Sequence, residues 1–299
     1  LTKPELITEI HEKYLKAGCD IVETNTFNAN KISQADYGTE NYCFELNKTA
    51  AKLAKEACQK YAEKGKPRFV AGSLGPTNKT LSISPKVEDP AYRDVTFDEI
   101  KEAYEEQIDG LVEGGCDLIL IETIFDTLNA KAAITATKKV LREKNIDLPI
   151  MISGTITDLS GRTLSGQTVE AFWTSVKHAK PMCVGLNCAL GASDLRPYVE
   201  KLSKIANTSV LCFPNAGLPN ELGEYDETPK MMGEHIEEWC KSGLVNIVGG
   251  CCGTSTHHIE HFVEAASNEL PRNYENIDSD KFSSFSGLEQ FTITPESNF

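Results

Sequence analysis

The chain has 299 residues, of which 40% are apolar, and a formal net charge of −14. That apolar content is enough for one large domain or two smaller ones with a sizeable core. The negative charge, with no basic stripe to offset it, argues against binding to a nucleic-acid backbone. No run of eighteen apolar residues is present, and the first residues do not form a signal peptide, so we expect a cytoplasmic protein.

Ten cysteines occur at irregular spacing along the chain. At this length and without a secretion signal, such usage is typical of reduced thiols in the cytosol rather than of a disulfide framework. A lone cysteine usually behaves as a small buried hydrophobe. We expect this of Cys19, Cys43, Cys58, Cys116, Cys183, Cys212 and Cys240.

Predicted helices and strands alternate through the first half of the sequence. Helices are expected over 2–17, 40–64 and 96–115, and strands over 18–27, 68–76 and 116–123. Thr2 with Glu5, and Thr96 with Glu99, have the spacing of capping boxes at two of the helix starts. In two places a helix leads through Gly-Cys-Asp into an apolar strand that finishes in Glu-Thr, which indicates a repeated αβ unit.

The segment from Pro76 to Val95 shows no periodicity and predicts a long loop that is a candidate for function. Beyond it, the alternation continues. Helices are expected over 127–143, 168–177, 194–206, 229–241 and 256–269, with strands over 149–156, 183–188, 210–217 and 244–248. From Pro271 to Phe299 no helical or strand period remains, which predicts a tail or a linker.

Continuous apolar strands that alternate with helices predict an α/β fold with a parallel sheet covered by helices. The pattern contains seven strands and eight helices. Because eight βα units close a barrel, we expect a (β/α)8 TIM-type barrel that lacks its first strand in this chain.

Three cysteines stand at predicted strand ends. Cys251 and Cys252 follow the apolar run 244–248 and sit between glycines, and Cys188 ends a similar run. Adjacent cysteines pair only with strain, which leaves metal ligation, a redox role or burial. Three thiolates at the ends of two strands would make an open site in which zinc keeps a fourth position for water or substrate.

Other polar residues and one glycine also fall at strand ends, where a barrel of this type places its active site. Glu122 ends a strand of leucine and isoleucine, so its charge needs a partner, and we expect a ligand ammonium there unless it serves a structural cap or ion pair. The histidines at 257, 258 and 261 are expected on a solvated helix face, with support of the metal site as the alternative. The strand-end residues beside the cysteines are Glu23, Asn25, Gly75, Glu122, Thr123 and Asn215.

The segments 185–188 and 249–254 resemble the zinc-dependent homocysteine S-methyltransferase family. Within it, the chain is most similar to the cobalamin-dependent methionine synthases, and this resemblance covers about residues 1–270. The segments that carry it are 23–27, 35–38, 75–81, 122–127 and 214–219.

The resemblance implies a zinc ion on the three strand-end cysteines, with the thiolate of homocysteine in the fourth position. It also implies that Glu122, Thr123 and the backbone near Gly75 hold the amino acid. We expect the other strand-end residues, Glu23, Asn25 and Asn215, to belong to the same substrate site, and no catalytic residue beyond the zinc site. The implied methyl donor is methylcobalamin on another module.

The resemblance further predicts a homocysteine-binding zinc barrel over 1–270 and an inter-domain linker over 271–299 that runs toward a folate-binding barrel. The family's first strand, with an Asp-Gly-x-Met-Gly-Thr-like end, has no counterpart here, so the chain is expected to be a fragment. One alternative is a stand-alone methyltransferase that uses betaine or S-methylmethionine. Another is a structural zinc or thiol-redox module.

Overall fold

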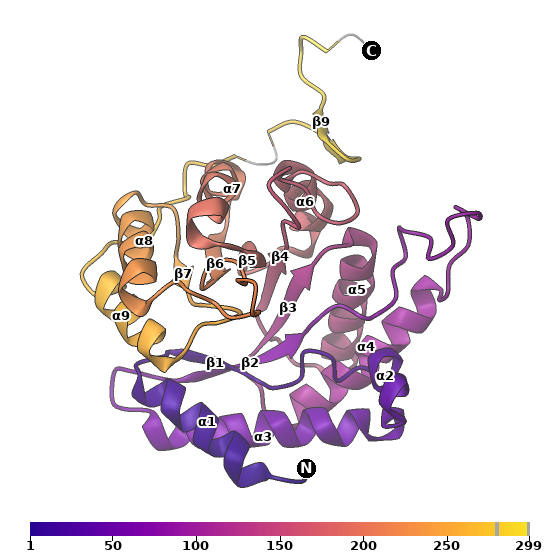
Figure 1. The fold of residues 1–299 in the computed structure, drawn as a ribbon. Coiled ribbons are helices and arrows are strands. Elements are labelled where there is room, and N and C mark those ends of the chain that lie inside the picture. Colours follow the sequence, from indigo (N-terminus) through magenta and orange to yellow (C-terminus); the bar gives the residue numbers. More distant parts are fainter. Residues whose placement is uncertain (279–280, 298–299) are drawn as a thin grey trace. The chain divides into compact units, whose positions relative to one another are not determined.

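The computed structural model describes residues 1–278 and 281–297. Seven strands follow the chain order β1-β2-β3-β4-β5-β6-β7 in one hydrogen-bonded sheet, which confirms the predicted α/β architecture. The chain divides within β4 (Ile150–Gly154) into two compact units, Leu1–Met151 and Ile152–Phe299, which are described separately (Figure 1). In the described part of the chain, we find no helix with the length and apolarity that a membrane crossing needs.

In the first unit, β1 pairs with β2 and β2 with β3, both in parallel. The middle of β3 is fully buried, and helices α1 and α3 pack side by side (Figure 1). Helices α3 and α4 approach so closely that a Cβ at Gly110 would lie 2.6 Å from the Phe44 carbonyl oxygen. The elements are α1 (Pro4–Lys16), β1 (Ile21–Glu23), α2 (Lys31–Gln34), η1 (Ala35–Tyr37), η2 (Glu40–Tyr42), α3 (Cys43–Tyr61), β2 (Phe69–Leu74), α4 (Phe97–Glu113), β3 (Leu118–Ile124) and α5 (Thr127–Lys144).

The two predicted capping boxes have different outcomes. The box at α4 is confirmed, because the Thr96 side chain accepts from the Glu99 N–H and the Glu99 carboxylate accepts from the Thr96 N–H at 2.7 Å. The box at α1 is wrong, since this helix starts at Pro4 and its N-cap is Lys3. A proline at the first helical position supplies the required φ and has no N–H to cap, so the N-cap lies one residue beyond the expected one.

The long loop is also confirmed, because residues 75–96 contain neither helix nor strand. The short helix α2 was not expected from the sequence. Its N-cap is Asn30, whose side-chain oxygen accepts from the Ser33 N–H at 2.9 Å. A helix of one turn leaves no apolar period to detect.

In the second unit, β5 pairs with β6 and β6 with β7, again in parallel. Six of the seven residues of β6 are buried, and α8 packs beside α9 (Figure 1). The elements are α6 (Val169–Val176), η3 (Lys177–Ala179), β5 (Cys183–Gly191), α7 (Ala192–Ile205), β6 (Ser209–Asn215), α8 (Pro229–Lys241), β7 (Ile247–Val248), α9 (Thr256–Ala266), β8 (Ser284–Ser286) and β9 (Gln290–Thr292).

The C-terminal segment contains a hairpin, so the prediction that no strand occurs after residue 270 is wrong. Strands β8 and β9 pair in antiparallel fashion and pack on α6, where the Ser286 hydroxyl donates to the Ala171 carbonyl at 2.7 Å. Strands of three residues are too short to show alternation, and contacts with α6 stabilise them. Residues 279–280 and 298–299 of the predicted tail lie outside the described residues, and the linker role stays a prediction.

Candidate metal centre and substrate-binding residues

Three thiols gather in the second unit, one in the second half of β5 and two in the turn after β7. The Sγ atoms of Cys188, Cys251 and Cys252 lie within 4.8 Å of one another, and the first and last of these are 3.7 Å apart. All three cysteines are free, because a disulfide requires about 2.05 Å between sulfurs. Within residues 1–278 and 281–297, this is the group of ligand-type side chains that is close enough to share one metal ion.

The backbone of β5 departs from regular strand geometry at Cys188. The register against β6 shifts between Asn187 and Gly191, and Cys188 and Ala189 have φ values of 63° and 61°. Left-handed conformations cost a non-glycine residue on the order of 1 kcal/mol each. The buried Thr155 hydroxyl donates to the Asn187 carbonyl at 2.9 Å and holds the residue ahead of the turn. This irregularity takes Cys188 out of the regular hydrogen-bonded pairing of β5 with β6.

The backbone N–H groups of Cys251 and Cys252 form hydrogen bonds with the end of β6. The Cys251 N–H donates to the Pro214 carbonyl at 2.9 Å, and the Cys252 N–H donates to Asn215 Oδ1 at 3.1 Å. A Cβ at Gly250 would lie 2.5 Å from the Thr254 side chain, so the turn requires glycine there. Asn215, which the sequence assigned to the substrate, thus lies beside the cysteine pair, where its side chain holds the Cys252 N–H.

The three thiols differ in acidity. The hydrogen bond from Cys251, helped by the Ala189 N–H, lowers the pKa of Cys188 to about 6 against an opposing effect of burial. The pKa of Cys251 is raised because its thiol donates to Cys188, and burial raises the pKa of Cys252. These hydrogen bonds therefore favour the thiolate form of Cys188, the form that binds metals.

The cluster fits a zinc ion. Tetrahedral zinc with Zn–S bonds of about 2.3 Å separates its sulfur ligands by about 3.8 Å. The distance of 3.7 Å between Cys188 Sγ and Cys252 Sγ matches one such edge. Three protein ligands leave the fourth position open, as in zinc sites that bind a substrate.

In the first unit, Glu122 lies near the end of β3 and is only 7% exposed. Its carboxylate accepts from the Ser73 hydroxyl at 2.5 Å and from the Thr123 hydroxyl at 3.3 Å. Thr123 has φ 55°, a conformation that is rare for a β-branched residue. The predicted buried acid at the strand end is thus present, and hydroxyl groups support it from two strand positions.

A second acid, Glu23 at the end of β1, faces Glu122. The surrounding protein atoms and the charge of Glu122 raise the pKa of Glu23 well above its ordinary value. The Glu23 side chain is nevertheless exposed to solvent, so the repulsion between the two carboxyl groups acts at an open site rather than in a closed cavity. Two neighbouring carboxyls of this kind favour a bound cation, because a positive charge removes their repulsion.

The backbone at Gly75 fits tightly against the turn after β1. Its N–H donates to the Phe27 carbonyl at 2.9 Å, and its own carbonyl accepts from the Tyr104 hydroxyl at 2.8 Å. A Cβ at this position would lie 2.5 Å from the Phe27 oxygen, so only glycine fits. Asn25 is exposed in the same turn, between two buried threonines.

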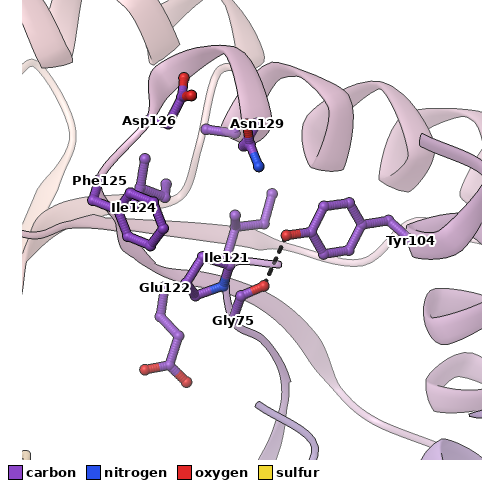
Figure 2. Close-up of a pocket in the computed structure, with 10 residues that line it drawn as sticks. Gly75, Tyr104, Ile121, Glu122, Ile124, Phe125, Asp126 and Asn129 are labelled. Atoms are coloured by element: carbon purple, nitrogen blue, oxygen red, sulfur yellow. Dashed lines mark hydrogen bonds between the residues drawn. The ribbon is translucent and has the colours of Figure 1, made fainter. Parts of the chain in front are cut away.

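A small cavity of about 10 Å³ adjoins Glu122 and Gly75. This volume holds about one water and is too small for an amino acid. Figure 2 shows the Glu122 carboxylate directed away from Tyr104, Asp126 and Asn129 on the other walls of this cavity. A ligand of Glu122 would therefore bind on the far side of that side chain from the cavity.

The structure corrects one expectation about the histidines. His258 is only 6% exposed, whereas the sequence placed it on a solvated face. Its ring bonds Ser255 and the Glu227 carbonyl, and burying a ring with both nitrogens satisfied costs little. His257 is exposed, as expected.

The remaining cysteines behave largely as expected. Most of them are buried, and burial raises the pKa of Cys58 to about 11 and of Cys116 to about 12. Cys19 and Cys240 are half-buried.

Sequence reasoning missed Ser73 as a partner of Glu122, because a serine inside an apolar strand carries no distinct signal.

The sequence matches the family described as homocysteine S-methyltransferase over residues 1–266. The chain belongs to this family. The resemblance read from its motifs is thereby confirmed, and membership makes the chain a methyltransferase domain.

Solved structures show the same fold. The metallated form of the homocysteine methyltransferase MmuM from Escherichia coli is 20% identical, with a TM-score of 0.69, over 87% of this chain and 84% of that chain. Its oxidised form is 19% identical with the same coverage and TM-score. Histamine dehydrogenase from a Rhizobium species, at 10% identity, has a TM-score of 0.55 over 87% of this chain and 43% of that chain.

Proposed function

We propose that this chain binds homocysteine, activates its thiol on a zinc ion held by Cys188, Cys251 and Cys252, and passes a methyl group to it to give methionine. The observation that carries the proposal is the cluster of three free thiols with the spacing of zinc ligands. A free thiol has a pKa of about 8.5, and zinc supplies the positive charge that deprotonates a coordinated thiol outright.

The substrate's amino group is assigned to Glu122. Its carboxylate is buried and is oriented by the Ser73 and Thr123 hydroxyls. Glu23 adds negative charge beside it. The backbone at Gly75 and the side chains of Asn25 and Asn215 complete the proposed set. These assignments draw on the family resemblance together with the local geometry of each residue.

The finer fold and context also belong to this proposal. The seven strands would be part of a (β/α)8 barrel over 1–270, with 271–299 as a linker. The methyl donor would be methylcobalamin carried by another module of a methionine synthase, next to a folate-binding module. A stand-alone enzyme that uses betaine or S-methylmethionine is the second candidate. The likeness to MmuM, named a homocysteine methyltransferase, is compatible with either.

Zinc-edge X-ray absorption with and without homocysteine tests the central claim. We expect the number of sulfur ligands to rise from three to four when homocysteine is added, with release of about one proton per homocysteine at neutral pH. Calorimetry in buffers of different ionisation enthalpy measures that proton. A structural zinc site would show unchanged coordination and a buffer-independent heat, which would refute the proposal.

The donor is tested separately by supplying methylcobalamin, betaine or S-methylmethionine to the zinc-loaded protein and measuring methionine. Methionine from methylcobalamin alone supports the methionine synthase role. Methionine from either of the other donors supports the stand-alone enzyme instead.

A further inference from the structure

Gln107 lies on the buried face of α4 and reaches the backbone beside the ends of two strands. Its side-chain Nε2 donates to the Thr26 carbonyl at 2.7 Å and to the Ser73 carbonyl at 3.5 Å. Thr26 is in the turn that follows β1, and Ser73 is in β2. One side-chain amide therefore joins this turn to the strand that supplies the hydroxyl partner of Glu122.

Neither carbonyl depends on Gln107 for a hydrogen bond. The Thr26 carbonyl also accepts from the Ala29 N–H at 2.9 Å, and the Ser73 carbonyl accepts from the Thr26 hydroxyl at 2.7 Å. The Oε1 atom of Gln107 is itself buried and has no hydrogen-bond partner within the described residues. An unsatisfied buried acceptor lowers stability, which an apolar side chain of similar shape would avoid. Gln107 is therefore a poor choice for stability alone, and such exceptions are typical of functional sites.

The backbone of Ser73 belongs to a closed ring of hydrogen bonds with two buried threonines. The Ser73 N–H donates to the Thr24 hydroxyl at 3.0 Å, and the Thr24 and Thr26 hydroxyl oxygens are 2.6 Å apart. Because the Thr26 hydroxyl gives its one proton to the Ser73 carbonyl, the bond between the threonines runs from Thr24 to Thr26. The ring fixes the backbone from which the Ser73 hydroxyl donates to Glu122 at 2.5 Å.

We infer that Gln107 is a positioning residue that holds this ring in place and thereby directs the Ser73 hydroxyl to the Glu122 carboxylate. The inference rests on the proposed function, because it takes Glu122 as the group that binds the ammonium of homocysteine. A carboxylate that is already oriented needs less ordering when its ligand binds, so the affinity is higher. Gln107 acts on the ligand through Thr26 and Ser73 and does not contact it.

The test compares the binding of two ligands to the zinc-loaded full chain by calorimetric titration. One is homocysteine, and the other is γ-mercaptobutanoate, which has the same thiol and carboxylate but no amino group. Gln107→Met removes the amide and nearly preserves the length of the side chain. We expect the Kd for homocysteine to rise roughly three- to tenfold, as for loss of one hydrogen bond, and the Kd for γ-mercaptobutanoate to stay the same. A general loosening of the site would weaken both ligands alike.

Asn47→Leu is the matched control. Asn47 is an equally buried amide on α3, and its Nδ2 donates to the Ala29 carbonyl at 2.8 Å, at the other end of the same turn. Its Oδ1 atom also has no partner in the described part of the chain. This variant should leave the ratio of the two Kd values unchanged, whatever it does to stability. Gln107→Leu repeats the test with a different side-chain shape, so that agreement with Gln107→Met excludes a packing fault of either variant.

A double-mutant cycle tests whether Gln107 acts through Ser73. The Ser73→Ala variant has no hydroxyl to direct, so adding Gln107→Met to it should raise the Kd for homocysteine no further. Additive effects of the two substitutions would overturn the inference, because Gln107 would then act on the ligand by another route.

The outcomes separate the inference from the proposed function. If Glu122→Gln loses the preference for homocysteine over γ-mercaptobutanoate while Gln107→Met keeps it, the inference alone is overturned. Unfolding of both Gln107 variants also overturns it, because the amide would then hold the fold rather than the site. If Glu122→Gln keeps the wild-type preference, or the wild-type chain does not bind homocysteine, the proposed function is refuted and the inference fails with it.

Discussion

Replacement of Glu122 by glutamine removes one negative charge and changes little volume. Glu122 is only 7% exposed, and glutamine can still accept from the Ser73 hydroxyl through its amide oxygen. The local structure should therefore persist while the attraction for an ammonium is lost. A hydrogen bond to a charged group contributes roughly 1.5 to 3 kcal/mol. We expect the Kd for homocysteine to rise by about ten- to 150-fold.

Calorimetric titration of the zinc-loaded protein measures this change, and metal analysis shows whether zinc remains. Glu45→Gln is the control, since it removes the same charge from an exposed position on α3. Ser73→Ala keeps the charge and removes one supporting donor, so its effect should be smaller, about two- to tenfold. Unchanged affinity in Glu122→Gln, with zinc bound, would show that the ammonium binds elsewhere and that Glu122 is structural.

Three further predictions concern single positions. Cys188→Ala should reduce bound zinc from one equivalent to nearly none by metal analysis, and retention of a full equivalent would contradict the ligand set. The raised pKa of Glu23 means that the folded state resists its ionisation, so stability is lost as pH rises from the unfolded value near 4.5 through the folded one. Glu23→Gln should match wild type in urea unfolding near pH 4 and exceed it by about 0.5 kcal/mol at pH 8, after allowance for solvent screening. Thr123→Gly should be about 1 kcal/mol more stable than Thr123→Ala because of the positive φ, and the reverse order would show that this backbone is unstrained.

Much of the fold follows from local signals in the sequence. Gly114 and Gly115 end a helix, and a run of leucine and isoleucine then continues as β3 to within a residue of its predicted end. Periodicity and glycine placement locate such elements because they depend on neighbours along the chain. The same signals placed Glu122 and the three clustered cysteines at strand ends.

Other strands are shorter than their apolar runs. The run 244–248 yields only two strand residues, Ile247 and Val248, in β7. Just ahead of them, the Asn246 side chain accepts from the Val210 N–H at 2.9 Å and takes the place of a ladder carbonyl. Apolarity alone cannot reveal such a substitution, since it depends on which strand lies alongside.

The turns that form the candidate site could not be predicted, because they oppose local preference. Thr123 and Cys188 have φ values of 55° and 63°, where glycine would be free of strain. Glycine at either place would remove the group that acts, a hydroxyl on Glu122 in one case and a metal-binding thiol in the other. The strain is therefore retained at positions whose side chains are needed. By contrast, Gly75, Gly250 and Gly253 stand where close contact leaves no room for a side chain. Sequence patterns mark the glycines, and only the structure shows which neighbouring residues adopt a glycine-like backbone in order to present a functional group.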